Sequence, residues 1–194
     1  MDVVFTVGHS THPIDRFLSL LGQHAITAIG DVRSTPFSRF NPQFNREKLR
    51  VSLQAAGIAY VFLGKELGAR SEDPACYENG RVQYDRLAAT DLFRSGLERV
   101  RQGAASYRLA LMCAEKEPLA CHRTILVARH VAALGFDVQH ILADGTLESH
   151  DDALSRLVRQ LDLAPGDLLR SRGEIIADAY RRQGEKIGYR KAEV

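Results

Sequence analysis

Short apolar, β-branched runs alternate along the chain with longer segments of helical period. The runs predict five strands, over residues 3–7, 26–32, 58–63, 107–112 and 137–142. Several of these runs contain almost no polar residue, which is typical of strands buried on both faces of a parallel sheet. Amphipathic segments between the runs predict connecting helices, so the pattern indicates repeated β-α units.

This alternation predicts an α/β fold: an open, mainly parallel five-stranded sheet in a Rossmann-like three-layer sandwich. Near the end of the chain, a helix over residues 151–161 is followed by a turn at residues 165–166 and an amphipathic basic helix over residues 168–186. We therefore expect a single α/β domain over residues 1–162. A C-terminal helical extension over residues 163–194 is expected either to pack on it or to be mobile.

The stretch from Gly64 to Gly80 is rich in turn-forming residues and has no periodicity. It predicts a long loop, and loops of this length in a compact domain are usually functional or mobile. We expect it to close over a site as a lid. A single helix over about residues 84–102 is predicted after it.

Reactive side chains gather where the predicted strands end and where the helix after the fourth strand begins. They are His9, Ser10, Asp31, Arg33, Cys113, Glu115, Cys121, His122 and Arg123. The carboxyl ends of parallel strands meet at one edge, where open sheets bind ligands. A strand order of 3-2-1-4-5 would place the crevice between the first and fourth strands. The sequence predicts a functional site there.

Taken singly, several of these residues have structural explanations. Ser10 can cap a helix, Asp31 and Arg33 can form a buried pair, and Cys113 can be a small core side chain. Arg123 is harder to explain, because a cation in the first turn of a helix opposes the helix dipole. An anionic ligand, or Glu115, would offset that cost.

The group as a whole favours an anion site. The amino end of the helix after Cys121 offers free backbone N–H groups, and Arg33 and Arg123 add guanidinium groups suited to phosphate or carboxylate. The same field lowers the pKa of Cys121 and favours its thiolate. His9 and His122 are candidate acids or bases near neutral pH, with Glu115 as a carboxylate partner.

Metal ligation is an alternative for the same residues. Cys113, Cys121, His9 and His122 offer donor types that suit zinc or iron. Seven residues separate the two cysteines, however, unlike the close pairs of structural zinc sites. The sequence therefore commits to no metal and requires no cofactor, leaves zinc or iron open, and leaves a redox pair of Cys113 with Cys121 as a third alternative.

Composition narrows the class of protein. The 194 residues are 45% hydrophobic and carry a net charge of +2, which is ordinary for a globular chain. The three cysteines are too few for a disulfide framework. No apolar run is long enough to span a bilayer, and the N-terminus lacks a signal-peptide pattern, so we expect a cytoplasmic protein without a membrane partner. Whether it forms a homodimer is left open.

One basic stretch suggests a different partner. Residues 33–50 hold five basic residues against one acid, Glu47, so a nucleic-acid-binding module is an alternative function. The aromatic residues there are few, chiefly Phe37, Phe40 and Phe44. Their spacing predicts loop anchors that pack onto the body.

The motifs resemble those of a prokaryotic family, domain of unknown function 488. The similarity lies in TVGHS near the start, DVRSTPFSRFNPQFN, GIAYVFLGKELGA and MCAEKEPLACHR. It covers roughly the first three quarters of the chain, and it implies an α/β domain but no reaction. The family pattern would comprise His9, Ser10, Asp31, Arg33, Pro36, Ser38, Tyr60, Leu67, Gly68, Cys113, Glu115, Cys121, His122 and Arg123.

Together these observations predict an enzyme that acts on a small anionic substrate, phosphorylated or nucleotide-like, with no reaction class assigned. A metal-dependent hydrolase or oxidoreductase using the same cluster is the variant of this prediction. The expected catalytic residues are Cys113, Glu115, Cys121, His9 and His122. The expected substrate-binding residues are Ser10, Asp31, Arg33, Ser38 and Arg123.

Overall fold

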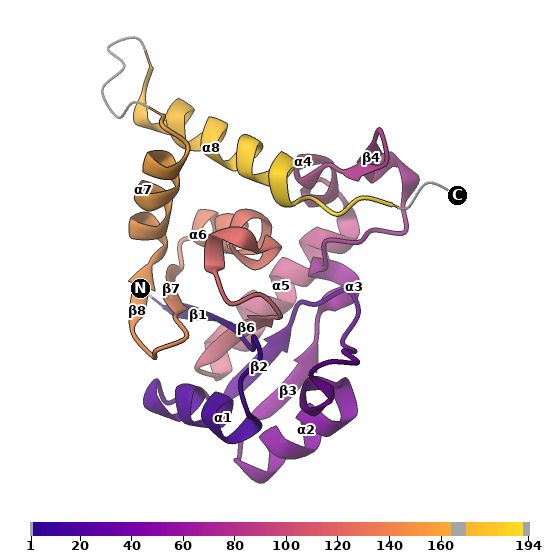
Figure 1. Ribbon diagram of the computed structural model, residues 1–194, viewed down its shortest axis with the longest axis vertical. Helices are drawn as coiled ribbons and strands as arrows, with labels where there is room; N and C mark the ends of the chain where they lie inside the picture. The colour runs from indigo at the N-terminus through magenta and orange to yellow at the C-terminus, as the bar shows by residue number, and fades with distance from the viewer. Residues whose placement is uncertain (1, 164–169, 192–194) are drawn as a thin grey trace.

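The computed structural model describes residues 2–163 and 170–191, and a six-stranded sheet runs through its centre (Figure 1). Five strands are parallel, and the sixth pairs antiparallel with β7 as a hairpin. The strands are β1 (Val3–Gly8), β2 (Ala28–Asp31), β3 (Ala59–Phe62), β6 (Leu109–Cys113), β7 (Asp137–Ile141) and β8 (Leu147–Ser149). The predicted α/β class is confirmed, and β8 is one strand more than predicted.

The strand order is β3-β2-β6-β1-β7-β8, so the predicted order was wrong. The fourth predicted strand, β6, lies between β1 and β2, with Ala110 level with both Phe5 and Ile29. Every residue of β6 is buried, which suits a strand flanked on both sides. This position brings the carboxyl ends of β1, β2 and β6 together, and Cys113 pairs level with Gly8.

Helices cover both faces of the sheet, as a three-layer sandwich requires. On one face, α1 (Ile14–Gln23) and α2 (Arg46–Ala55) pack against Ala110 and Met112. On the other face, Leu109 and Leu111 join a core shared with α5 (Asp91–Ser106), α6 (Arg129–Ala133) and the C-terminal helices. Alternate residues of β6 therefore serve opposite cores, as expected for a central strand.

The segment after β3 contains short elements rather than the long loop predicted. They are α3 (Gly64–Leu67), the 3₁₀ turn η2 (Pro74–Cys76) and the hairpin of β4 (Tyr77–Glu78) with β5 (Arg81–Val82). Elements of two to four residues are too short to show periodicity. The helix predicted over residues 84–102 is broken into α4 (Tyr84–Ala88) and α5, where the Thr90 hydroxyl accepts a hydrogen bond from the Phe93 N–H at the start of α5.

The C-terminal part of the chain packs on the sandwich. Helix α7 (His150–Gln160) lies beside α8 (Arg172–Ile187), whose first turn is closed by a capping box between Ser171 and Glu174. The tail after α8 then pairs with the β4–β5 hairpin: the N–H of Val82 donates to Tyr189 O at 2.9 Å. The predicted turn at residues 165–166 and the start of the predicted last helix lie outside the described residues.

None of the helices within residues 2–163 and 170–191 combines the length and the apolar character needed to cross a membrane.

Candidate functional site

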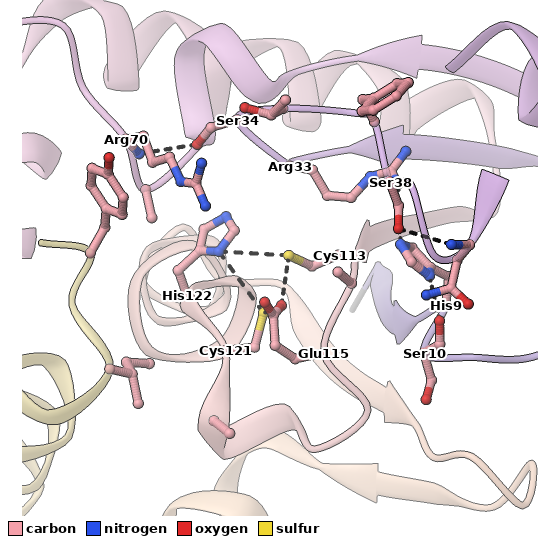
Figure 2. A pocket seen from close by; sticks show the side chains of 18 of the residues that line it. His9, Ser10, Arg33, Ser34, Ser38, Arg70, Cys113, Glu115, Cys121 and His122 are labelled. Atoms are coloured by element: carbon pink, nitrogen blue, oxygen red, sulfur yellow. Dashed lines mark hydrogen bonds between the residues drawn. The ribbon is translucent and has the colours of Figure 1, made fainter. Parts of the chain in front are cut away.

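A cavity of about 630 Å³ opens at the carboxyl edge of the sheet (Figure 2). Its walls come from the ends of β1 and β6, from the loop after β2, from α4 and from the tail after α8. Eight of the ten predicted site residues line it: His9, Ser10, Arg33, Ser38, Cys113, Glu115, Cys121 and His122. Asp31 and Arg123 are completely buried and are not among the lining residues.

Four of these side chains form a thiol cluster, which we define as Cys113, Glu115, Cys121 and His122. Glu115 Oε2 lies 3.1 Å from Cys113 Sγ and 2.9 Å from Cys121 Sγ. His122 Nδ1 faces the same two sulfurs, at 3.7 and 3.9 Å (Figure 2). Both cysteines are free and buried, whereas part of the Glu115 residue reaches solvent.

The backbone around the cluster is tightly packed. Gly8, at the end of β1, has no Cβ, and a Cβ there would lie 1.9 Å from Glu115 O. Only glycine therefore allows the segment after β6 to pass so close to β1. A 3₁₀ turn, η3 (Pro118–Ala120), then leads to Cys121 and to the π-helical segment η4 (Arg123–Ala128). Single π-helical turns often occur at functional sites.

Arg123 holds this loop instead of facing the cavity. Its guanidinium donates to Glu115 O at 2.6 Å and to Lys116 O at 3.3 Å. Its backbone N–H, at the amino end of η4, donates to Cys121 Sγ at 3.4 Å. The acceptor at this helix terminus is therefore a sulfur of the chain itself, and Arg123 positions the backbone that carries Glu115.

The protonation of the cluster is set by burial and by mutual charge. Burial raises the pKa of Cys113 well above its usual value. Burial acts in the same direction on Cys121, but the hydrogen bond from Cys113 and the charge of Arg123 outweigh it and hold its pKa well below the usual range. Burial and the nearby Cys121 charge raise the pKa of Glu115. Of the two cysteines, Cys121 is therefore the one whose thiolate form is favoured.

His9, Arg33 and Asp31 form a second, closed network beside the cavity. Arg33 donates to both carboxylate oxygens of Asp31, at 2.9 and 2.6 Å, and its Nη1 lies 3.1 Å from His9 Nε2. Tyr60, which the family resemblance includes, donates its hydroxyl to Asp31 at 2.8 Å. Burial and the Arg33 charge lower the pKa of His9 to about 4. His9 is thus neutral at pH 7, with both ring nitrogens engaged.

Arg70 is a cavity residue that the sequence reasoning missed. It reaches into the cavity on the side of His122 (Figure 2), and its guanidinium stacks on the ring of Tyr189 at 4.6 Å from the centroid. No ion pair among the described residues involves it. Its backbone N–H donates to Ser34 Oγ at 3.0 Å, which ties its loop to the segment after β2.

Hydroxyl groups form the part of the cavity wall that comes from the segments after β1 and β2, and Ser34 places this part next to Arg70. They belong to Ser10, Thr11, Ser34, Thr35 and Ser38. The Ser38 hydroxyl accepts a hydrogen bond from the Asn41 N–H at 3.0 Å, and the backbone N–H of Ser38 donates to Asn45 Oδ1 at 2.6 Å. This wall suits a polar ligand that is rich in hydrogen-bond acceptors.

The three phenylalanines of this loop behave differently from one another. Phe44 is completely buried and stacks on His9 at 4.2 Å between ring centroids, as an anchor should. Phe37 and Phe40 are 66% and 83% exposed, so the prediction that they pack onto the body was wrong. Phe37 instead lines the cavity, and Arg39 lies over the Phe40 ring at 5.3 Å.

Of the four side chains proposed from the sequence as metal ligands, the structure brings three together. Donor atoms of Cys113, Cys121 and His122 all lie within 4.8 Å of one another. His9 lies apart from this group because its two ring nitrogens are engaged with Ser10 O and Arg33.

Comparison with known proteins gives one match. Residues 13–130, more than half of the chain, match the family model described as Domain of unknown function DUF488. No curated protein and no solved structure matches the chain significantly. The matched range includes the whole thiol cluster together with Asp31, Arg33 and Arg70.

Proposed function

The chain belongs to the DUF488 family, and from this premise we propose that it is an enzyme acting on a small anionic, nucleotide-like substrate in the cavity. One observation carries the proposal: reactive groups and binding groups line the same cavity. Cys121 and Glu115 supply a thiolate and a proton-accepting carboxylate. Arg70 and the hydroxyl wall supply binding groups for an anion.

The charge of Arg70 supports the anionic part of the proposal. The Arg33 charge is balanced by Asp31, and Arg123 is bound to backbone carbonyls, so neither is available to a ligand. Arg70 has no such partner among the described residues, and its planar guanidinium suits a phosphate. Tyr189 fixes its position by stacking.

The exposed ring of Phe37 supports the nucleotide-like part. An aromatic face that lines a polar cavity and stays 66% exposed offers a stacking surface for a base. A ligand with a phosphate at Arg70 and a base at Phe37 would use both side chains.

The compartment is part of the same proposal. Cys76, Cys113 and Cys121 are all free. Because free thiols persist in reducing compartments, a cytoplasmic location suits a site that depends on two of them.

Isothermal titration calorimetry with inorganic phosphate and adenosine monophosphate tests the binding. We expect both to bind and the nucleotide to bind more tightly. Arg70→Ala should weaken both about tenfold, which corresponds to about 1.4 kcal/mol. Phe37→Ala should weaken only the nucleotide. Arg101→Ala is the matched control, because Arg101 is an exposed arginine paired with Glu98 on α5.

Turnover is tested by incubating the protein with a panel of phosphorylated nucleotides and analysing the products by mass spectrometry. The wild type should convert at least one compound, and Glu115→Gln should not. The proposal fails if no anion binds, or if Arg70→Ala and Arg101→Ala bind every ligand equally well.

The exposed Phe40 with Arg39 over its ring favours a second candidate, binding of a single-stranded nucleic acid at the rim. Fluorescence anisotropy with a labelled oligonucleotide tests it. This candidate expects affinity that falls steeply with salt, is lost in Phe40→Ala and is unchanged in Cys121→Ser.

A further inference from the structure

The arrangement of donor atoms in the thiol cluster points to a metal centre. We propose that Cys113, Cys121 and His122 bind one zinc ion, and that Glu115 stands beside it as a general base. This inference deepens the proposed function and rests on it for its chemistry. The donor geometry itself stands independently.

The spacing of the donors fits a tetrahedral site. Zinc bonds of about 2.3 Å to sulfur and about 2.0 Å to nitrogen place neighbouring sulfur and nitrogen ligands about 3.6 Å apart. His122 Nδ1 lies 3.7 Å from Cys113 Sγ and 3.9 Å from Cys121 Sγ. Shifts of a few tenths of an ångström would bring the three donors to bonding distance of one ion.

The imidazole of His122 is oriented as a ligand. Its Nε2 lies 3.0 Å from Val32 O, a carbonyl that can only accept, so Nε2 carries a proton and the lone pair of the neutral ring lies on Nδ1. That lone pair faces both sulfurs. Histidines that bind metals almost always donate their other ring N–H in this way.

The surroundings also favour sulfur ligands. The N–H of Arg123 donates to Cys121 Sγ, and the Arg123 side chain holds the loop between the two cysteines through Glu115 O. Both thiols are nearly inaccessible to solvent except at the cavity wall, so the ion would be held by the core and reached from the cavity. Two thiolates and one imidazole would leave the zinc complex with no net charge.

Glu115 fits the role of a base better than that of a fourth ligand. Its Oε2 makes hydrogen-bond contacts of 2.9 and 3.1 Å with the sulfurs, closer than two ligands of one tetrahedral ion would lie. Zinc sites with two sulfurs and a histidine keep a position open for water, and a nearby glutamate that is not a ligand can handle its proton.

The chemistry of such a centre would be hydrolytic. Water on the zinc would give one proton to the Glu115 carboxylate, and its oxygen would form a bond to the electrophilic atom of the anionic substrate. The bond to the leaving group would break, and the proton on Glu115 would pass to that group. No oxidant or reductant is required.

Metal titration of the purified protein, without a histidine tag and after removal of metals under reducing conditions, tests the site. We expect one equivalent of zinc to bind, and Co²⁺ to give a sulfur-to-metal charge-transfer band. Cys113→Ser, Cys121→Ser and His122→Ala should each weaken zinc binding by at least about 100-fold. Cys76→Ser is the matched control, since Cys76 is equally buried but lies outside the cluster, and it should bind zinc normally.

A second measurement needs no variant and covers any that fail to fold. Alkylation by iodoacetamide, mapped by mass spectrometry, should slow at Cys113 and Cys121 when zinc is added and should not change at Cys76. The inference is overturned if cobalt gives no charge-transfer band and zinc leaves the alkylation of all three cysteines unchanged. In that case, nucleotide binding that still depends on Arg70 would preserve the proposed function. Zinc binding without any anion binding would preserve only the metal centre.

Discussion

Two groups of clustered polar side chains in this protein are built on different principles. The thiol cluster converges: two sulfurs meet one carboxylate oxygen, and one imidazole nitrogen faces both sulfurs. The second group, which we call the histidine chain, is linear and consists of Thr6, His140, His150 and Tyr180. The Thr6 hydroxyl lies 2.7 Å from His140 Nδ1, His140 Nε2 lies 3.1 Å from His150 Nδ1, and His150 Nε2 lies 2.7 Å from the Tyr180 hydroxyl. Each of these hydrogen bonds needs one proton.

The difference separates polar groups that serve the fold from those for which we propose a ligand. In the histidine chain every imidazole nitrogen has a hydrogen-bond partner while both rings stay neutral. These hydrogen bonds therefore link β1, β7, α7 and α8 without any buried charge. In the thiol cluster, acidic groups share one small volume at a cavity wall. This arrangement supports the proposal that the cluster receives a cation or a reactant.

The largest effect on stability is expected from Arg33, which lines the cavity but belongs to a closed network like the histidine chain. Arg33→Met leaves the fully buried Asp31 carboxylate without its cation and should cost about 3–5 kcal/mol of unfolding free energy. Urea denaturation measures it. Arg50→Met, which removes an arginine from an exposed pair, is the control and should change stability by less than about 0.5 kcal/mol. Equal losses in both variants would contradict the comparison.

Acid should act next, through His150 of the histidine chain and His9 beside the cavity. Burial lowers the pKa of each from 6.5 to about 4, and the Arg33 charge adds to the effect at His9. Between pH 6.5 and about 4, these histidines bind protons in the unfolded chain but not in the folded protein. The stability is therefore complete above pH 6.5 and falls as the pH drops to about 4. Each histidine contributes roughly 3 kcal/mol to this loss.

Denaturation of metal-free protein at a series of pH values measures this loss without any contribution from zinc release. His150→Gln should make the dependence between pH 6.5 and 4 less steep without abolishing it, because His9 and the buried His140, whose pKa burial also lowers, remain. A stability that stays constant over that interval in the wild type would show that neither histidine is held neutral.

The positions of the reactive residues could be predicted from the sequence, because they follow local patterns. The apolar run before Cys113 marks a strand end, and the apolar helix after His122 marks a helix start. Both patterns arise from burial that neighbouring residues share. The clustering of Cys113, Glu115, Cys121 and His122 at the carboxyl edge follows from these two boundaries and from the parallel sheet.

The strand order, Arg70 and Tyr189 could not be predicted in the same way. Whether β6 lies beside β2 or at the far side of β1 depends on packing between residues distant in sequence. Arg70 lies between elements too short to show a period, and Tyr189 reaches the cavity only because the tail pairs with Val82. The spacing of Phe37 in the sequence resembles that of the buried Phe44, so it does not reveal that Phe37 is exposed. That exposure follows from the path of the loop.

A smaller effect is expected at the end of the histidine chain. Tyr180→Phe removes the hydroxyl bound to His150 Nε2 and leaves one buried ring nitrogen unpaired, which should cost about 1–2 kcal/mol. Thermal or urea denaturation measures it. Because the histidine chain is separate from the thiol cluster, the zinc affinity and the nucleotide affinity of this variant should equal those of the wild type. A change in zinc affinity would show that the two groups are coupled through η4.

The smallest effect on stability is expected at Glu115. Glu115→Gln keeps the size of the side chain and removes a carboxylate that shares its volume with an adjacent thiolate, so unfolding free energy should change by no more than about 1 kcal/mol. Turnover of the substrate should nevertheless fall by about 10²–10⁴-fold, because the base is lost. One equivalent of zinc should remain bound, since the proposed site holds zinc without Glu115. Loss of the zinc in this variant would instead show that the carboxylate is the fourth ligand. The cluster would then be a structural zinc site with four protein ligands and no position open for water.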